Sequence, residues 1–270
     1  MDCTTATISQ HRSAPPVSEL QRNASTEALQ ERFQHWNSIR IVIETGTHSP
    51  WVSRLLEGVG HSVVVANARK LRMIYESDRK NDRLDARMLA RLGRADVELL
   101  SPVQHRRAST QADLAVIRGR DALVAARTQL INTCRGMVKA MGGRLPKCTT
   151  AVFASRIKDS VPRELQAALR PLLASVRALT DQIKSCDLKV RALAAKQYPE
   201  TMLLQQVQGV GPLVSLTYVL TLDDPHRFLN SRAVGSYLGL RPKQSESGSI
   251  APQLRITKAG SGHLRRLLVQ

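Results

Sequence analysis

The chain has 270 residues, of which 42% are hydrophobic, so it can bury a sizeable core and does not have the composition of a disordered protein. Its 40 Lys and Arg against 22 Asp and Glu, a formal net charge of +18, favour a polyanionic partner, most simply nucleic acid. Because only 3% of the residues are aromatic, base stacking is a poor explanation for such binding, and contact with the backbone and shape of a duplex is a better one.

The cysteines and the apolar runs limit where the protein works. Cys3, Cys134, Cys148 and Cys186 are far apart and form no C-x-x-C pair, which argues against a zinc knuckle and against a secreted disulfide framework. No stretch approaches the roughly 20 apolar residues of a membrane span, and the N-terminus lacks the layout of a signal peptide. We therefore expect a cytoplasmic protein with no membrane partner.

The first hundred residues predict an irregular segment followed by an α/β layer. Residues 1–25 are rich in Thr, Ser and Pro and show no periodic apolar pattern, which is typical of an irregular segment. A helix then begins at Ser25 or Thr26, either of which can cap it. The β-branched run 39–44, a proline-opened helix from Pro50 and the run 61–66 follow, and strand, helix, strand is the pattern of an α/β layer.

Three acids in this region form a candidate metal site. Glu44 closes the first strand, while Asp82 and Asp85 are three residues apart, so on a helix both carboxylates leave the same face. Like charges at this spacing cost a few tenths of a kcal/mol, a cost that a divalent cation would remove. Carboxylate oxygens are the ligands that such hard cations prefer. On spacing alone, a solvated helix face remains the commoner explanation.

A positive rim surrounds these acids, which is the electrostatics of a phosphodiester-cleaving site rather than of a calcium store. The alternative, without Glu44, is a solvated basic helix. Nine cations lie in this stretch: Arg69, Lys70, Arg72, Arg79, Lys80, Arg83, Arg87, Arg91 and Arg94.

Two long helices are predicted next, from about 105 to 136 and from about 161 to 197, because apolar residues recur there at helical spacing. Gly142-Gly143 and Pro146 interrupt them, which favours an antiparallel, coiled pair that spans distance or dimerises. The expected core positions of the first helix are Leu114, Ile117, Ala122, Ala125, Leu130 and Val138.

The last 70 residues carry two further candidate sites. Gly209 and Gly211 lie in a hairpin before a helix, whose free backbone N–H groups could hold a phosphate, although many tight helix connections look the same. Ser247 lies on a loop among cations that could take up charge developing at a phosphodiester, although most loop serines are turn residues. The cations near it in sequence are Arg241, Lys243, Arg255, Lys258, His263, Arg265 and Arg266.

Together these residues resemble a known family, the DEDD transposases of the insertion-sequence-110 group, which are bridge-RNA-guided DNA recombinases. The resemblance runs from about Thr26 to Gln270. Its first region is Ile43-Glu44-Thr45-Gly46-Thr47-His48-Ser49-Pro50-Trp51, Gly60-His61 and Lys80-Asn81-Asp82-Arg83-Leu84-Asp85-Ala86. Its second region is Gly209-Val210-Gly211-Pro212, Tyr237-Leu238-Gly239-Leu240-Arg241-Pro242, Ser247-Gly248, Ile256-Thr257-Lys258-Ala259-Gly260 and Leu264-Arg265-Arg266-Leu267-Leu268.

The resemblance implies an α/β plus all-α fold. It predicts an irregular segment at 1–25, an incomplete RuvC-like (RNase H-type) nuclease domain at 26–104, an antiparallel helical coiled coil at 105–200, and a C-terminal transposase domain with a helix-hairpin-helix-like turn at 201–270. In the family, an Asp-Glu-Asp-Asp set binds Mg²⁺, and Glu44, Asp82 and Asp85 match its last three members.

The resemblance also implies roles and partners. Ser247, with Ser245 as the alternative, matches the serine that links covalently to DNA. The partners would be DNA, a structured bridge RNA and further copies of the chain in a dimer or tetramer, in a nucleoid-associated protein. The residues expected to contact nucleic acid are Arg79, Lys80, Arg83, Gly209, Gly211, Arg241, Lys243, Lys258, Arg265 and Arg266.

Two departures from the family pattern lead us to expect a copy truncated at both ends, whose activity is reduced or lost. The strand with the first aspartate has no counterpart in residues 1–22, and the chain stops at Gln270 where family members continue. Two other functions stay open: a RuvC-type junction nuclease without the serine step, and a nucleic-acid-binding remnant that does not cut.

Overall fold

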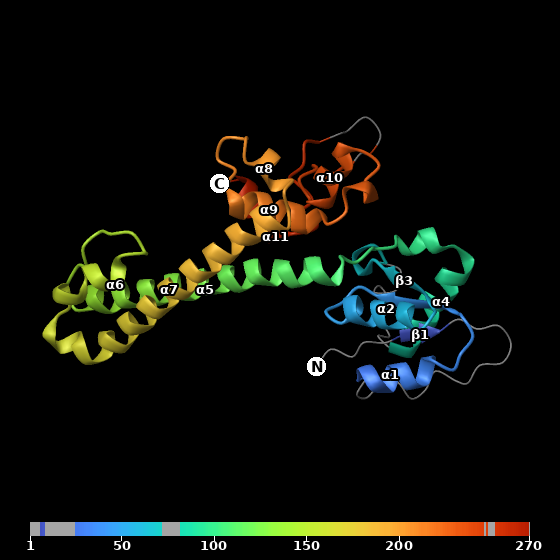
Figure 1. The fold of residues 1–270 in the computed structure, drawn as a ribbon, viewed down its shortest axis with the longest axis horizontal. Coiled ribbons are helices and arrows are strands. Elements are labelled where there is room, and N and C mark those ends of the chain that lie inside the picture. The colour runs from blue at the N-terminus through green and yellow to red at the C-terminus, as the bar shows by residue number, and fades with distance from the viewer. Residues whose placement is uncertain (1–5, 9–24, 72–81, 246, 248–251, 270) are drawn as a thin grey trace. The chain divides into compact units, whose positions relative to one another are not determined.

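The computed structural model describes residues 6–8, 25–71, 82–245, 247 and 252–269, with the backbone alone for 6–8, 82 and 83. The chain divides into two compact units, Met1–Arg106 and Arg107–Gln270, each of which is described by itself (Figure 1). The first unit is an α/β layer and the second is helical, which confirms the predicted combination of an α/β part and an all-α part. None of the described helices is long and apolar enough to cross a lipid bilayer.

A three-stranded sheet in the order β1-β2-β3 forms the centre of the first unit. β1 is Ala6–Ile8, β2 is Arg40–Glu44 and β3 is Ser62–Ala66. β3 runs parallel to β2, with Glu44 opposite Ala66, and helix α2 (Ser49–Gly58) makes the crossover between them. The strands β2 and β3 therefore lie where the sequence predicted them.

β1 corrects the prediction that residues 1–25 are irregular throughout. Its three residues pair antiparallel with β2, Ala6 opposite Ile43 and Ile8 opposite Ile41. A three-residue strand is too short to show an alternating pattern in the sequence. The strand β1 forms because the free edge of β2 has backbone N–H and C=O groups that need hydrogen-bond partners.

Each face of the sheet packs against helices. Ile41, Ile43 and Val65 form one core with Leu29 and Phe33 of α1 (Thr26–Phe33) and with α2. The Ser25 hydroxyl accepts a hydrogen bond from the Ala28 N–H at 3.2 Å and caps α1, one of the two caps that the sequence allowed.

The opposite face of the sheet packs against α4 (Asp82–Ala95) and η2 (Val97–Leu100), through a core that contains Val42, Ala66 and Leu89. At Gly93 the helix comes so close to β2 that a Cβ atom there would lie 2.5 Å from Cγ2 of Val42. The Arg40 guanidinium donates a hydrogen bond to the Gly93 carbonyl at 3.2 Å. η1 (Ala68–Lys70) follows β3.

Two long antiparallel helices, α5 and α7, organise the second unit (Figure 1). Their far end is closed by α6, η3 and η4, and their near end packs against α8 and α9, while α11 packs against α9. The bounds are α5 Ala108–Ala140, α6 Phe153–Arg156, η3 Lys158–Ser160, η4 Arg163–Leu165, α7 Gln166–Lys196, α8 Thr201–Leu204, α9 Pro212–Leu222, η5 Pro225–Arg227, α10 Ser231–Tyr237 and α11 Gly262–Val269.

Separate apolar cores hold the two ends of the pair. The far core contains Ile131, Cys134, Phe153 and Leu169, and burial raises the pKa of the Cys134 thiol. The near core combines α5 and α7 with α9 and contains Leu114, Ile117, Val190, Leu216 and Leu220. The second compact unit therefore spans both segments that the sequence analysis separated at residue 200.

Polar contacts hold the middle of the pair, where the predicted core positions Ala122 and Ala125 are exposed. Arg120 pairs with Asp187 at 2.5 Å, and Arg127 donates to the Thr180 hydroxyl at 3.5 Å. An apolar stripe continuous along α5 was therefore the wrong expectation, because helical spacing cannot show which turns face a charged partner.

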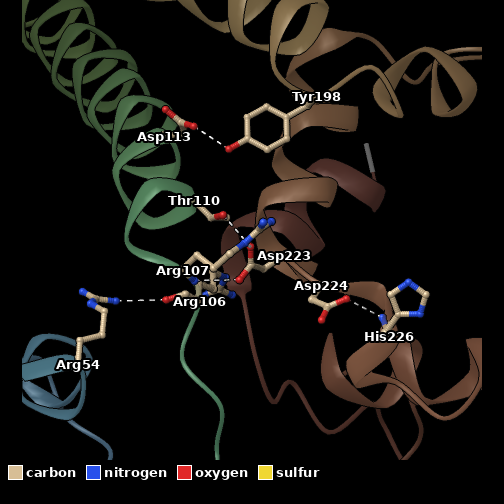
Figure 2. Close-up of polar contacts among 9 residues, drawn as sticks. All are labelled: Arg54, Arg106, Arg107, Thr110, Asp113, Tyr198, Asp223, Asp224 and His226. Atoms are coloured by element: carbon tan, nitrogen blue, oxygen red, sulfur yellow. Dashed lines mark hydrogen bonds and ion pairs between the residues drawn. The ribbon is translucent and has the colours of Figure 1, made fainter. Parts of the chain in front are cut away.

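Asp223 joins the end of α9 to the start of α5 (Figure 2). Its carboxylate accepts hydrogen bonds from the Arg107 N–H at 2.9 Å, from Nε of Arg107 at 2.9 Å and from the Thr110 hydroxyl at 2.6 Å. Burial by itself would raise the pKa of Asp223, but these hydrogen bonds outweigh it and lower that pKa. The charge lies at the N-terminus of α5, where the helix dipole favours an anion.

One turn further along α5, the Tyr198 hydroxyl donates a hydrogen bond to Asp113 at 2.6 Å (Figure 2). Burial and this hydrogen bond raise the pKa of Tyr198 to about 12. The tyrosine therefore stays a neutral donor throughout the physiological range.

Gly93→Ala tests the close approach of α4 to β2. Alanine in a helix interior is normally about 1 kcal/mol better than glycine, but here its Cβ would clash with Val42, so we expect a loss of about 1–3 kcal/mol in the free energy of unfolding. Gly58→Ala in α2 is the control, since a Cβ there meets nothing within 4 Å. Trp36 and Trp51 both lie in the first unit, so urea unfolding followed by tryptophan fluorescence reports both variants. Equal effects would contradict the packing.

Asp223→Asn tests the cap on α5. We expect a loss of about 1–3 kcal/mol at pH 7, measured by urea unfolding with circular dichroism at 222 nm. Because the pKa of Asp223 is lowered on folding, its charge stabilises the fold above the ordinary carboxyl pKa of about 4 and stops doing so as the pH falls below it. The difference between wild type and variant should therefore shrink at low pH. Asp224→Asn, which removes a charge but keeps the Oδ1 acceptor that caps the His226 N–H, should cost less than half as much.

Candidate active site and nucleic-acid interface

The packing of α4 brings its first turn to the same end of the sheet as Glu44. Gly93, near the end of α4, lies against Val42 and Arg40, while Leu89 shares a core with Ala66, the strand partner of Glu44. The helix therefore runs antiparallel to β2, and its N-terminal residues point back toward the carboxyl ends of β2 and β3. Asp82 begins this helix and Asp85 lies one turn further on.

Of the predicted metal ligands, Glu44 and Asp85 are both half-buried. The structure does not describe the side chains of Asp82 and Arg83, and Arg79 and Lys80 lie outside the described residues. Among the side chains that are described, no three of His, Cys, Asp or Glu gather closely enough to hold a metal ion. The donors are of the right chemistry for a hard cation, since carboxylates at this edge supply oxygen ligands alone.

The glycine hairpin joins α8 to α9. Gly209 has a left-handed backbone (φ 85°), and Gly211 caps α9, whose first residue is proline. No Lys or Arg lies between Thr201 and Gly211, and the exposed side chains of the hairpin include Met202, Leu203 and Val207. The hairpin itself is therefore neutral, so any phosphate contact there depends on backbone N–H groups.

Ser247 is exposed on a loop whose two ends are joined by backbone hydrogen bonds; we call this joined part the base of the loop. Backbone hydrogen bonds join the two sides of this base: Lys243 N–H to the Arg255 carbonyl at 3.0 Å, Thr257 N–H to Arg241 at 2.9 Å and Lys258 N–H to Gly239 at 3.1 Å. Ser245, the alternative nucleophile, is exposed on the same loop. The base is therefore a paired stretch of backbone, and the described residues Ser245 and Ser247 beyond it are exposed.

The base of the Ser247 loop is closed by two glycines and an arginine. A Cβ at Gly239 would lie 2.1 Å from the Ala259 carbonyl oxygen, and one at Gly260 would lie 2.1 Å from that of Tyr237. Arg265 donates from one guanidinium nitrogen to the carbonyls of Leu238 at 2.9 Å and Ala259 at 2.5 Å. Sequence reasoning missed this internal role of Arg265; the two glycines were the available signal.

The other predicted cations have different surroundings. Arg266 pairs with Asp121 of α5 at 2.9 Å, and Arg241 donates to the Gln244 side chain at 2.8 Å. Lys243 and Lys258 are exposed, and Lys258 has a left-handed backbone (φ 55°). Contact of Arg241, Lys243, Lys258, Arg265 and Arg266 with nucleic acid stays a prediction.

Two sequence profiles of one transposase family match the two parts of the chain. The DEDD transposase profile of the IS110 group matches residues 11–142, and the profile described as Transposase IS116/IS110/IS902 family matches residues 201–270. The first covers Glu44, Asp82 and Asp85, and the second covers Ser247. The chain therefore belongs to the IS110 family of transposases.

Individual relatives agree with this assignment. The transposase for insertion sequence element IS1111A of Coxiella burnetii is 30% identical over 203 residues, which cover 72% of this chain and 54% of the relative. The transposase for insertion sequence element IS1328 of Yersinia enterocolitica is 27% identical over 241 residues, which cover 85% of this chain and 69% of the relative. The chain thus spans between about half and about two thirds of these relatives.

Arg265→Ala tests the closure of the loop base. Loss of its two charged hydrogen bonds, about 1.5–3 kcal/mol, should speed hydrogen exchange of the Thr257 and Lys258 amides roughly 10- to 100-fold. The matched control is Arg266→Ala, which removes a pair at an exposed arginine worth at most about 1 kcal/mol and should change those amides less than about fivefold. The same protection in both variants would show that Arg265 does not hold the base.

Proposed function

We propose that this chain cleaves and rejoins DNA strands for the movement of an insertion sequence, with acid-bound Mg²⁺ and a serine nucleophile. The observation that carries the proposal is the arrangement of family-matched residues within each unit. Glu44 and the first turn of α4 share one end of the sheet, and Ser247 is exposed on a loop with a closed base. Both features are what a strand-transfer enzyme needs.

Glu44, Asp82 and Asp85 would hold the magnesium ion. When bound, it supplies Lewis-acid stabilisation of the negative charge that develops on the scissile phosphate. The half-buried positions of Glu44 and Asp85 favour this role, because a carboxylate partly removed from water gains more from a nearby cation than an exposed one does. The adjacent cations, Arg79, Lys80 and Arg83, would then hold the flanking phosphates.

Ser247 would carry the covalent step. Its Oγ forms a bond to phosphorus as the bond from phosphorus to a deoxyribose oxygen breaks, and the serine proton ends on the released hydroxyl. The energy of the phosphodiester is kept in the serine ester, so a new hydroxyl can attack it and rejoin the strand. Exposed Lys243 and Lys258 near the loop base support this role by offering positive charge to the phosphate.

The wider proposal follows the family. The acids and Ser247 belong to different units, and a composite site would form on one DNA strand in a dimer or tetramer. A structured bridge RNA would choose the DNA sites by base pairing, while the protein contacts backbone and shape, in keeping with its low aromatic content. In this arrangement α5 and α7 act as a coiled-coil spacer, the glycine hairpin contacts a DNA backbone, and the protein is nucleoid-associated.

A covalent adduct is the direct test. The full chain is incubated with supercoiled DNA carrying its insertion site, the candidate RNA and Mg²⁺, and protein–DNA adducts are separated on a denaturing gel. We expect an adduct that falls by roughly a thousandfold or more in Ser247→Ala and in Asp85→Asn, and that disappears without Mg²⁺. Ser245→Ala is the matched control and should retain it.

Other outcomes identify the alternatives. Cleavage that persists in Ser247→Ala but is lost in Asp85→Asn would identify a junction nuclease without a serine step. Binding with a steep salt dependence but no cleavage in any variant would identify a remnant that holds nucleic acid without cutting it. An adduct that survives in Ser247→Ala and moves to Ser245 would reassign the nucleophile.

A further inference from the structure

The far end of the α5–α7 pair is strongly basic. Residues 139–177 contain eight Lys or Arg and only two acids, Asp159 and Glu164. We call the eight cations the distal basic surface; all of them are exposed, and they are Lys139, Arg144, Lys147, Arg156, Lys158, Arg163, Arg170 and Arg177. The end of α5, the segment around α6 and the start of α7 bring them together (Figure 1).

None of these eight cations forms an ion pair with any side chain in the described part of the chain. Closer to α9, by contrast, three arginines, Arg107, Arg120 and Arg266, each contact a carboxylate of another helix or its end. Cations that stabilise a fold are paired in this way. A cluster of unpaired cations repels itself, and such a cluster is typical of a surface that binds a polyanion.

A groove gives this surface a shape. It has a volume of about 670 Å³ and lies between α7 and the segment that contains η3. Lys158, Arg170 and Arg177 line it, over a floor that includes Val161 and Leu173. Arg170 and Arg177 are two helical turns apart on one face of α7, about 10 Å along the axis.

The two acids of the groove do not cancel its charge. Asp181, at the inner end, already contacts Lys184 at 3.5 Å. Among the described side chains, Asp159 is therefore the lining acid that has no cation contact. Three cations line the same groove, so its net charge is positive. The groove thus offers several separated positive charges beside a short apolar floor, which suits a sugar–phosphate backbone better than an apolar helix.

We propose that the distal basic surface is a separate binding site for a nucleic-acid backbone, centred on Lys158, Arg170 and Arg177. Its ligand is a run of phosphodiesters, supplied either by duplex DNA or by a structured RNA. The helical pair then holds nucleic acid at its far end, roughly 30–40 Å along α7 from the C-terminal end of that helix, in addition to any spacing or dimerising role. The inference rests on the proposed function only in that the partner is a nucleic acid.

Binding measured on the full chain tests this site. The variant Lys158→Gln/Arg170→Gln/Arg177→Gln is compared with Lys189→Gln/Arg191→Gln/Lys196→Gln, which removes three exposed cations from the other end of α7. The probes are a 30-base-pair DNA duplex of arbitrary sequence and a hairpin RNA of similar length, titrated at several salt concentrations. Circular dichroism and urea unfolding check that both variants keep the helical fold.

We expect the distal variant to lower the slope of log affinity against log salt by about 2 to 3 for one probe, since each phosphate contact contributes roughly 0.7 to 0.9. The control should lower it by less than about 1. The probe that loses the larger slope identifies DNA or RNA as the source of the backbone. Because no cleavage is needed, this result is independent of the adduct experiment.

Equal slope changes in the two variants would overturn the site, because they would mean that only net charge matters. An unchanged slope in the distal variant would also overturn it. Light scattering of both variants completes the test: if the distal variant alone loses its oligomeric state and keeps its affinity for both probes, the surface binds a second copy of the chain and the proposal is wrong.

Discussion

Backbone packing too close for a side chain sets the positions of both candidate catalytic elements. At Gly93, α4 lies against Val42 of β2, and this contact turns the first residues of the helix toward the end of the sheet where Glu44 lies. At Gly239 and Gly260, two turns of backbone lie against each other and form the base of the Ser247 loop. Any Cβ at these positions would meet an atom within 2.5 Å. The positions of the candidate catalytic residues therefore depend on glycines that have no catalytic group themselves.

Charge is used in two different ways along the helical unit. Near α9, carboxylates of Asp223, Asp187 and Asp121 receive cations and join helices that are far apart in sequence. At the far end, cations are exposed without such partners, and the helices are held there by an apolar core instead. The cations behind the net charge of +18 thus include some that stabilise the fold and others that are available to a polyanion.

Much of the fold follows from local patterns. The strands β2 and β3, the capped helix α1 and the long helices α5 and α7 lie within a few residues of their predicted bounds, because periodicity, caps and glycines act over one or two turns. The strand β1, the exposed Ala122 and Ala125, and the internal contacts of Arg265 were not predicted. Each of these depends on a partner more than about 20 residues away or on another element of the fold.

By itself, the sequence determined the family, the candidate acids and serine, and the order of β2, β3 and the long helices, since motifs and short-range spacing are written in consecutive residues. Only the tertiary structure decided which charges are available. Arg265 and Arg266 are adjacent and chemically identical, yet one binds two backbone carbonyls and the other pairs with Asp121. That difference arises because neighbours on a helix point about 100° apart, so each meets a different part of the folded chain.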